Sequence, residues 1–284
     1  MNIPVYYHIP KCGGVYVLSL YQHLSRLNER NIRLPLKLWT ETTNRCCRVI
    51  KVYINNSRYI EMTGIIEIDD LLDLNADLES YSNIFSIKEL YELVDTQKIK
   101  ITSIFIQPCG DGNMIESRKQ VDQLLCYINK KPIYFTTIRE IFDRLYSEYS
   151  YMLDSMSDHE PDLANYRGYD NFEKFLIECE AYNNIISRHI AYDIVLDKKS
   201  FENVKVFFDH FTISTMQSIK ETAIRVWQQC YGWVGDCTDD SIFYKNKNIN
   251  KKKLLFDDIS LKAKDKFLSQ TEWDRELYAY LSQT

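Results

Sequence analysis

The chain begins with a short apolar run that leads into a turn of lysine and glycine, and this stretch reads Tyr6-Tyr7-His8-Ile9-Pro10-Lys11-Cys12-Gly13-Gly14. Glycines let backbone N–H groups approach a ligand closely, and a helix that follows them adds the positive end of its dipole. Lys11 supplies a mobile positive charge at the same turn. The stretch therefore predicts a loop that cradles a phosphate or a similar anion.

The residues around this turn predict a strand before it and a helix after it. Residues 3–8 are β-prone and short, as expected of a buried strand, and apolar residues recur at helical spacing from 15 to about 27. Further strands are predicted at 101–106 and 132–137, and helices at 116–129 and 139–152. This order predicts an α/β fold with a central parallel sheet flanked by helices.

Other parts of the chain predict a hairpin and a helical C-terminal half. Two β-branched runs, 47–54 and 58–66, flank a turn-forming tripeptide and predict a β-hairpin, and 69–98 carry leucine-spaced helix patterns. Beyond residue 154 the patterns are mainly helical, at 171–190, 199–207, 214–230 and 259–282. Since no linker or repeat divides the chain, we expect a single domain over 1–284 with a hairpin and helical insertion at about 40–98.

The amino-acid composition and net charge of the chain limit the kinds of molecule that it is expected to bind. The net charge of −5 argues against nucleic acid and anionic membranes, which select basic surfaces. No run of 18 apolar residues and no signal-peptide pattern is present, so we expect a soluble, cytoplasmic protein without a membrane span. The eight cysteines are scattered without a C-x-x-C pair, which favours reduced thiols and no metal site, although a Cys46–Cys47 disulfide or a metal site stays open.

A second candidate anion site follows the strand predicted at 132–137. Arg139 stands at the strand end, and Ser147 follows eight residues later on the predicted helix. Helical spacing places residues 140, 144, 147 and 151 on one face, opposite the apolar residues 141, 145 and 152, so Ser147 points away from the core. An arginine fork with a hydroxyl can clamp a phosphate, whereas the plain alternative is a surface arginine and a solvated serine.

Together, these motifs resemble those of the PAPS-dependent sulfotransferases, in the branch that includes the carbohydrate O-sulfotransferases. The run from His8 to Gly14 resembles that family's 5′-phosphosulfate loop, and Arg139 with Ser147 resembles its 3′-phosphate motif. The similarity continues at Asn184 with Arg188 and at Trp273-Asp274. The resemblance implies a P-loop-like fold and a donor, 3′-phosphoadenosine 5′-phosphosulfate (PAPS), from which a sulfuryl group passes to a hydroxyl of an acceptor, expected to be a glycan.

The resemblance also implies roles for single residues. Lys11 would stabilise the departing 5′-phosphate and the sulfuryl group, and Arg139 and Ser147 would hold the 3′-phosphate. The 5′-phosphate would be held by backbone amides of the loop, which are those of Cys12, Gly13, Gly14, Val15 and Tyr16.

The catalytic base is less clear from the residues. Members of that family place a histidine or glutamate after the strand that precedes the 3′-phosphate motif, but here the nearby carboxylates are those of Asp111 and Glu116. Asp111 is the candidate base, although an aspartate before a glycine is more often a turn residue. His8 lies near the loop and is either a group that touches the sulfuryl or acceptor or a structural histidine.

Two alternative functions follow from the loop. Cys12, Val15 and Tyr16 stand where relatives carry hydroxyl side chains, which leaves open a non-catalytic or vestigial protein that binds the nucleotide. A nucleoside-triphosphate kinase is disfavoured because Lys11 precedes the glycines, whereas G-x-x-x-x-G-K-[ST] places the lysine after them.

Overall fold

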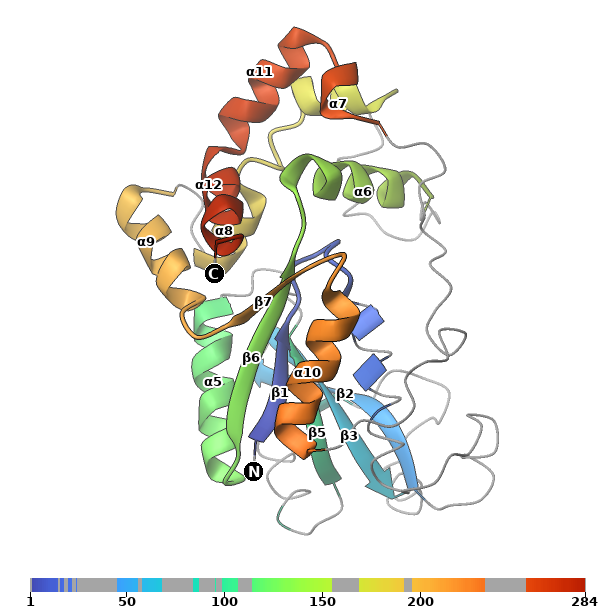
Figure 1. Ribbon diagram of the computed structural model, residues 1–284, viewed down its shortest axis with the longest axis vertical. Helices are drawn as coiled ribbons and strands as arrows, with labels where there is room; N and C mark the ends of the chain where they lie inside the picture. The colour runs from blue at the N-terminus through green and yellow to red at the C-terminus, as the bar shows by residue number, and fades with distance from the viewer. Residues whose placement is uncertain are drawn as a thin grey trace. The chain divides into compact units, whose positions relative to one another are not determined.

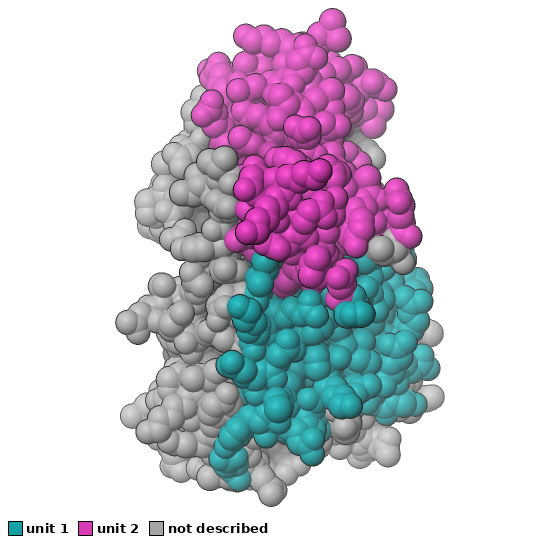
Figure 2. Space-filling model, turned by 90° about the vertical axis from the view of Figure 1, so that its left-hand side faces the viewer, with its two compact units in different colours: residues 1–137, 210–244 teal, residues 138–209, 245–284 magenta. Residues whose placement is uncertain are grey.

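The computed structural model describes residues 2–14, 16–17, 20–21, 24, 45–55, 58–67, 84–86, 95, 99–106, 114–154, 169–191, 196–232 and 254–283, and for β2, β3 and β4 it describes the backbone alone. The chain divides into two compact units, Met1–Thr137 with His210–Tyr244, and Ile138–Asp209 with Lys245–Thr284 (Figure 2). Each unit has its own internal packing and is described separately.

The first unit is built on a mixed sheet with strand order β4-β2-β3-β5-β1-β6-β7. Its centre is parallel: β1 (Asn2–Tyr7) pairs with β5 (Ile99–Ile106) on one side and with β6 (Lys131–Ile138) on the other. The register sets Tyr7 beside both Ile106 and Thr136, so the three strands reach the same level. The predicted α/β fold with a parallel sheet centre is therefore confirmed (Figure 1).

A hairpin extends this sheet on the β5 side. Strands β2 (Arg45–Asn55) and β3 (Arg58–Glu67) pair antiparallel where the sequence predicts a hairpin, and β3 continues antiparallel onto β5. A third strand, β4 (Ile84–Ser86), pairs parallel with β2 and falls inside the region 69–98 that the sequence pattern assigns to helix. The helix assignment is wrong at β4, and most of the remainder of that region lies outside the described residues.

Two labelled helices and the segment after β1 cover the first unit's core. Helix α5 (Met114–Tyr127) precedes β6, and α10 (Ile219–Tyr231) packs on β1 (Figure 1). The short strand β7 (Thr212–Thr215) occupies the start of the helix predicted at 214–230. One apolar cluster joins these elements and consists of Tyr6, Val17, Leu20, Tyr21, Leu24, Phe105, Phe135, Ile219, Ala223, Val226 and Trp227.

The second unit is helical in its described part, apart from the last residue of β6. Its elements are α6 (Ile141–Asp154), α7 (Phe172–Glu178), α8 (Ile185–Ala191), α9 (Lys198–Phe207), a 3-10 turn (Phe256–Asp258), α11 (Leu261–Gln270) and α12 (Glu272–Leu281). The sequence predicts this helical half but joins α7 with α8, and α11 with α12, into longer helices.

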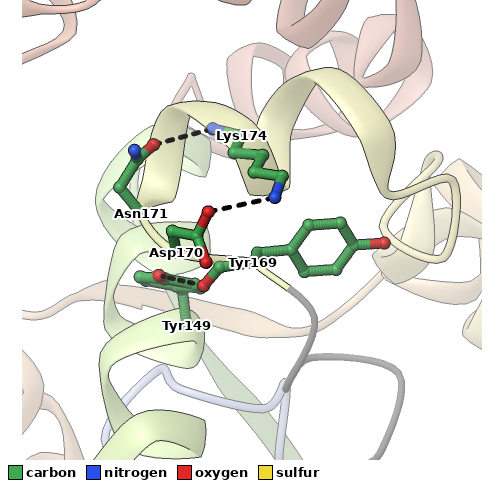
Figure 3. Close-up of polar contacts among 5 residues, drawn as sticks. All are labelled: Tyr149, Tyr169, Asp170, Asn171 and Lys174. Atoms are coloured by element: carbon green, nitrogen blue, oxygen red, sulfur yellow. Dashed lines mark hydrogen bonds and ion pairs between the residues drawn. The ribbon is translucent and has the colours of Figure 1, made fainter.

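Polar contacts fix the start of α7 (Figure 3). Asn171 accepts a hydrogen bond from the backbone N–H of Lys174 at 2.9 Å, and the Lys174 ammonium pairs with Asp170 at 3.1 Å. The Tyr149 hydroxyl of α6 donates to the Tyr169 carbonyl at 3.3 Å. An N-cap side chain satisfies an amide that has no partner inside the helix, so these contacts stabilise a helix too short to persist alone.

Helices α8 and α12 cap each other. The Asn184 side-chain oxygen accepts from the backbone N–H groups of Trp273 and Asp274, at 2.8 and 3.2 Å. In return, the Asp274 carboxylate accepts from the backbone N–H groups of Ile186 and Ser187, at 3.1 and 2.8 Å, and from the Ser187 hydroxyl at 2.7 Å. Burial raises the pKa of Asp274, and these donors and Arg144 lower it in part. These reciprocal hydrogen bonds hold the N-terminus of α8 against the N-terminus of α12.

Replacing Asp274 with alanine tests this exchange of caps. We expect Asp274→Ala to lower the free energy of unfolding by about 2–5 kcal/mol, because each buried donor left without an acceptor costs about 1–3 kcal/mol. Urea unfolding followed by circular dichroism measures the loss. Asp265→Ala on α11 is the control, since Asp265 is exposed and its loss should stay within about 0.5 kcal/mol. Equal losses in the two variants would contradict the capping role.

Candidate anion-binding site

The loop at the end of β1 has the strand, turn and helix order that the sequence predicts. The His8 N–H still donates to the Ile106 carbonyl at 2.8 Å, which carries the pairing with β5 one residue past the strand. The Cys12 N–H then donates back to the Ile9 carbonyl at 3.1 Å and closes the turn. Helical residues begin at Gly14 and include Tyr16, Val17, Leu20, Tyr21 and Leu24.

The backbone of this loop is left-handed at two positions. Lys11 and Gly13 have φ values of 66° and 80°, so two residues of the turn are left-handed on either side of Cys12. For lysine this conformation costs about 1–2 kcal/mol relative to the right-handed region. Backbone turns that alternate in this way direct successive N–H groups into one concavity, which favours an anion.

Within the predicted set of amides, from Cys12 to Tyr16, those of Gly13 and Gly14 have no backbone acceptor in the part of the chain that the structure describes. By contrast, the Cys12 amide closes the turn and the Tyr16 amide donates to the Gly13 carbonyl at 3.0 Å. The first N–H groups of a helix have no partner inside it and carry its positive dipole end. Of the amides that the sequence predicts to hold the 5′-phosphate, those of Gly13 and Gly14 are therefore the candidate donors to an anion.

The two glycines are also required by packing. A Cβ placed on Gly14 would lie 2.2 Å from Cδ2 of His8, and one on Gly13 would lie 2.6 Å from Cδ1 of Ile219 on α10. The loop is therefore held between the His8 imidazole and the start of α10, with no room for a side chain at either glycine.

The side chains of the loop mostly turn toward protein. Cys12 is 1% exposed, and Tyr16 packs against the apolar cluster. The His8 ring lies 5.3 Å from the Phe105 ring and stacks at 6.1 Å on Tyr6. These contacts give His8 the structural role that the sequence left open, and its catalytic role stays a prediction. Lys11, within the turn, is half-exposed.

Two predicted site residues lie outside the described residues. They are Asp111, in the segment 107–113, and Val15. Their proposed roles stay predictions.

Arg139 and Ser147 belong to the second unit, whereas the loop belongs to the first. Arg139 is half-buried between β6 and α6, and Ser147 is half-buried on α6. One part of the prediction for this helix is wrong: Arg144, assigned to the same outer face as Ser147, is 2% exposed and pairs with Glu148 at 2.6 Å. Helical periodicity treats arginine as a surface residue, but a carboxylate one turn away allows it to be buried.

The C-terminal part of the resemblance falls on helix ends. Asn184 and Asp274 are the reciprocal caps of α8 and α12, and Arg188 donates to the Asn183 carbonyl at 3.1 Å. These contacts give the residues a structural role without reference to a ligand.

In comparisons with known proteins, no family model matches the chain, and neither a curated protein nor a solved structure matches it. Among the described residues, no three His, Cys, Asp or Glu side chains gather as metal ligands would. None of the helices described here has the length and apolar character needed to cross a membrane.

A double-mutant cycle tests the packing of the loop. Alanine is favoured over glycine within a helix by about 1 kcal/mol, yet we expect Gly14→Ala to destabilise the protein by about 1–3 kcal/mol because its Cβ would meet the His8 ring. In a His8→Ala background, the same Gly14→Ala change should be neutral or stabilising. Urea unfolding of the four proteins gives the coupling energy. A Gly14→Ala effect that is the same in both backgrounds would show that the ring does not limit the loop.

Proposed function

We propose that this protein is a PAPS-dependent sulfotransferase that moves a sulfuryl group from PAPS to a hydroxyl of a carbohydrate acceptor. The observation that carries the proposal is the loop 8–14, where Lys11 stands close in sequence to Gly13 and Gly14, whose amides have no backbone acceptor among the described residues and lie at the start of a helix. The loop follows β1, the strand with parallel neighbours on both sides. Open α/β sheets bind their ligands in the crevice beyond such carboxyl ends, where strand order reverses.

The chemistry of the loop fits a phosphosulfate better than a nucleoside triphosphate. Its lysine precedes the glycines and is held by a left-handed backbone, whereas the triphosphate-binding loop places lysine after its last glycine. Two amides and one lysine offer charge and donors for one phosphate with its sulfuryl group, and the acidic net charge of the chain leaves anion binding to such a local site.

In the proposed reaction, the acceptor oxygen attacks sulfur in line with the bond from sulfur to the 5′-phosphate oxygen. The new oxygen–sulfur bond forms as the old one breaks, 3′,5′-adenosine bisphosphate leaves, and the acceptor proton passes to a base, for which Asp111 and His8 are the candidates. Lys11 and the Gly13 and Gly14 amides stabilise the negative charge that develops on the leaving phosphate, which is an electrostatic form of catalysis. Arg139 and Ser147 are proposed to bind the 3′-phosphate, with the arginine as a forked donor.

A second candidate function is nucleotide binding without transfer. It is favoured by the buried Cys12 side chain and by the packing of Tyr16 on the core, because neither supplies the hydroxyl that relatives direct at the phosphate. Transfer of labelled sulfate from PAPS to a panel of glycans separates the two functions. Product formation identifies an enzyme, and binding without product identifies a nucleotide-binding protein.

Thermal unfolding with two nucleotides tests the nucleotide class. A ligand that binds only the folded state raises the melting temperature, so 3′,5′-adenosine bisphosphate should raise it and ATP should not. A rise with ATP alone would contradict the proposal.

Replacing Lys11 tests its role in transfer. We expect Lys11→Ala to lower the rate of sulfate transfer by at least about 100-fold, the order of effect seen when one group that stabilises transition-state charge is removed. Product formation from labelled PAPS measures the rate, and urea unfolding checks that the variant is folded. Lys262→Ala, an exposed lysine on α11, is the matched control and should keep the original rate. Unchanged transfer by Lys11→Ala would remove the central part of the proposal.

A further inference from the structure

A network of buried hydroxyl groups lies beneath the loop 8–14. The Tyr6 hydroxyl, at the end of β1, donates to the carbonyl of Cys12 at 3.2 Å. It also hydrogen-bonds the side chain of Thr137 on β6, and the Thr137 hydroxyl lies 2.9 Å from that of Ser214 on β7. All three side chains are at most 2% exposed. The network therefore connects the loop to the ends of two strands that are distant in the sequence.

The donors of this network can be assigned. The Tyr6 proton is committed to the Cys12 carbonyl, so the Thr137 hydroxyl is the donor to the Tyr6 oxygen. The Ser214 hydroxyl is then the donor in its 2.9 Å contact with Thr137, and it also lies 3.3 Å from the Thr136 carbonyl. Burial raises the pKa of Tyr6, which keeps this hydroxyl protonated and able to donate to Cys12. A fourth hydroxyl, that of Thr136, donates to the Tyr7 carbonyl at 2.7 Å and ties β6 to the same strand end.

The bond from Tyr6 to Cys12 has a consequence for Gly13. The carbonyl of Cys12 and the N–H of Gly13 belong to one planar peptide, and no described peptide bond is cis, so the two groups point in opposite directions. Holding the carbonyl inward against Tyr6 turns the Gly13 N–H away from the core. Among the described residues, that N–H has no backbone acceptor.

We infer that Tyr6 is a positioning residue of the anion site, which orients the Gly13 amide toward the 5′-phosphate of the bound nucleotide by holding the Cys12 carbonyl from below. This inference rests on the proposed function for the identity of the anion. Thr137 and Ser214 support Tyr6 in this role, and neither contacts the anion. An amide that is already oriented loses less entropy when the ligand binds, so the network raises affinity.

The same core supplies a matched control. Tyr21 is 2% exposed, belongs to the same apolar cluster, and donates its hydroxyl to a backbone carbonyl, that of Ala223 on α10, also at 3.2 Å. Tyr6→Phe and Tyr21→Phe therefore each remove one buried hydroxyl that bonds a carbonyl, and keep both rings. They differ in whether the carbonyl belongs to the loop.

The experiment compares these variants by two measurements. Amide hydrogen exchange of the peptide spanning residues 8–14, without ligand, reports on the loop, and calorimetric titration with 3′,5′-adenosine bisphosphate reports on the site. We expect Tyr6→Phe to speed exchange in this peptide and to raise the dissociation constant roughly 3- to 10-fold, which is what one net hydrogen bond is worth. Tyr21→Phe should change neither, and Thr137→Val should change both in the direction of Tyr6→Phe.

The two measurements separate failure of the inference from failure of the proposed function. If the original protein does not bind the bisphosphate, the proposed function fails, while exchange in the loop still decides whether Tyr6 orders it. If the original protein binds and Tyr6→Phe matches it in both affinity and exchange, the positioning role is overturned. Equal changes in Tyr6→Phe and Tyr21→Phe would assign the effect to general loosening of the core and would overturn the role as well. Should Tyr6→Phe fail to fold, Thr137→Val carries the same test.

Discussion

Parallel pairing on both sides of β1 is the constraint from which the rest of the first unit follows. The register brings Tyr7 level with Ile106 and Thr136, and the chain must leave the sheet immediately afterwards. It does so through a turn in which Lys11 and Gly13 are left-handed, and the helical residues Val17, Leu20, Tyr21 and Leu24 that follow belong to the apolar cluster of the core. The glycines are needed at this point because His8 and α10 already occupy the space where their side chains would be. One strand position thus determines the direction of the loop and the start of the helix that follows it.

The second unit is organised by the ends of its helices. Helices α7 and α8 have seven residues each, which is below the length at which an isolated helix persists in water. Each therefore depends on partners at its N-terminus: Asn171 supplies a local cap for α7, and Asp274 supplies a distant one for α8. The Arg144 and Glu148 pair is buried in the same unit, and Arg144 also favours the ionised form of Asp274. Removing one member of such a set leaves donors or charge buried without a partner, which costs more than the set contributes when intact.

Local patterns in the sequence predict the elements that local forces determine. The strand before His8, the helix after Gly14 and the hairpin of β2 and β3 all follow from β-propensity, glycine and helical spacing. Errors occur where a particular partner decides the outcome. The four-residue β7 is a strand because β6, distant in the sequence, lies beside it, and Arg144 is buried because Glu148, one turn along the same helix, pairs with it. The same limit applies to the site. The lysine and glycines could be read from the sequence. The bonds of Ser214 with Thr137 and Thr136 span 77 and 78 positions, the bond between Tyr6 and Thr137 spans more, and all of them depend on which strands are neighbours.

In the proposed anion site, recognition rests mainly on the backbone, because most side chains of the loop 8–14 face the core. Cys12 is buried and Tyr16 packs on the apolar cluster, so the donors left to the loop are amides and the ammonium of Lys11. A hydroxyl can rotate to meet a phosphate, but an amide is fixed by its peptide plane and bonds well only if that plane is already oriented. Because the loop 8–14 has no hydroxyl side chain, binding in the proposed site depends on the groups that hold the backbone of the loop in position. In this protein that support comes from Tyr6 and the strand ends beneath it, so the hydroxyl groups that matter for the loop lie under it and not within it.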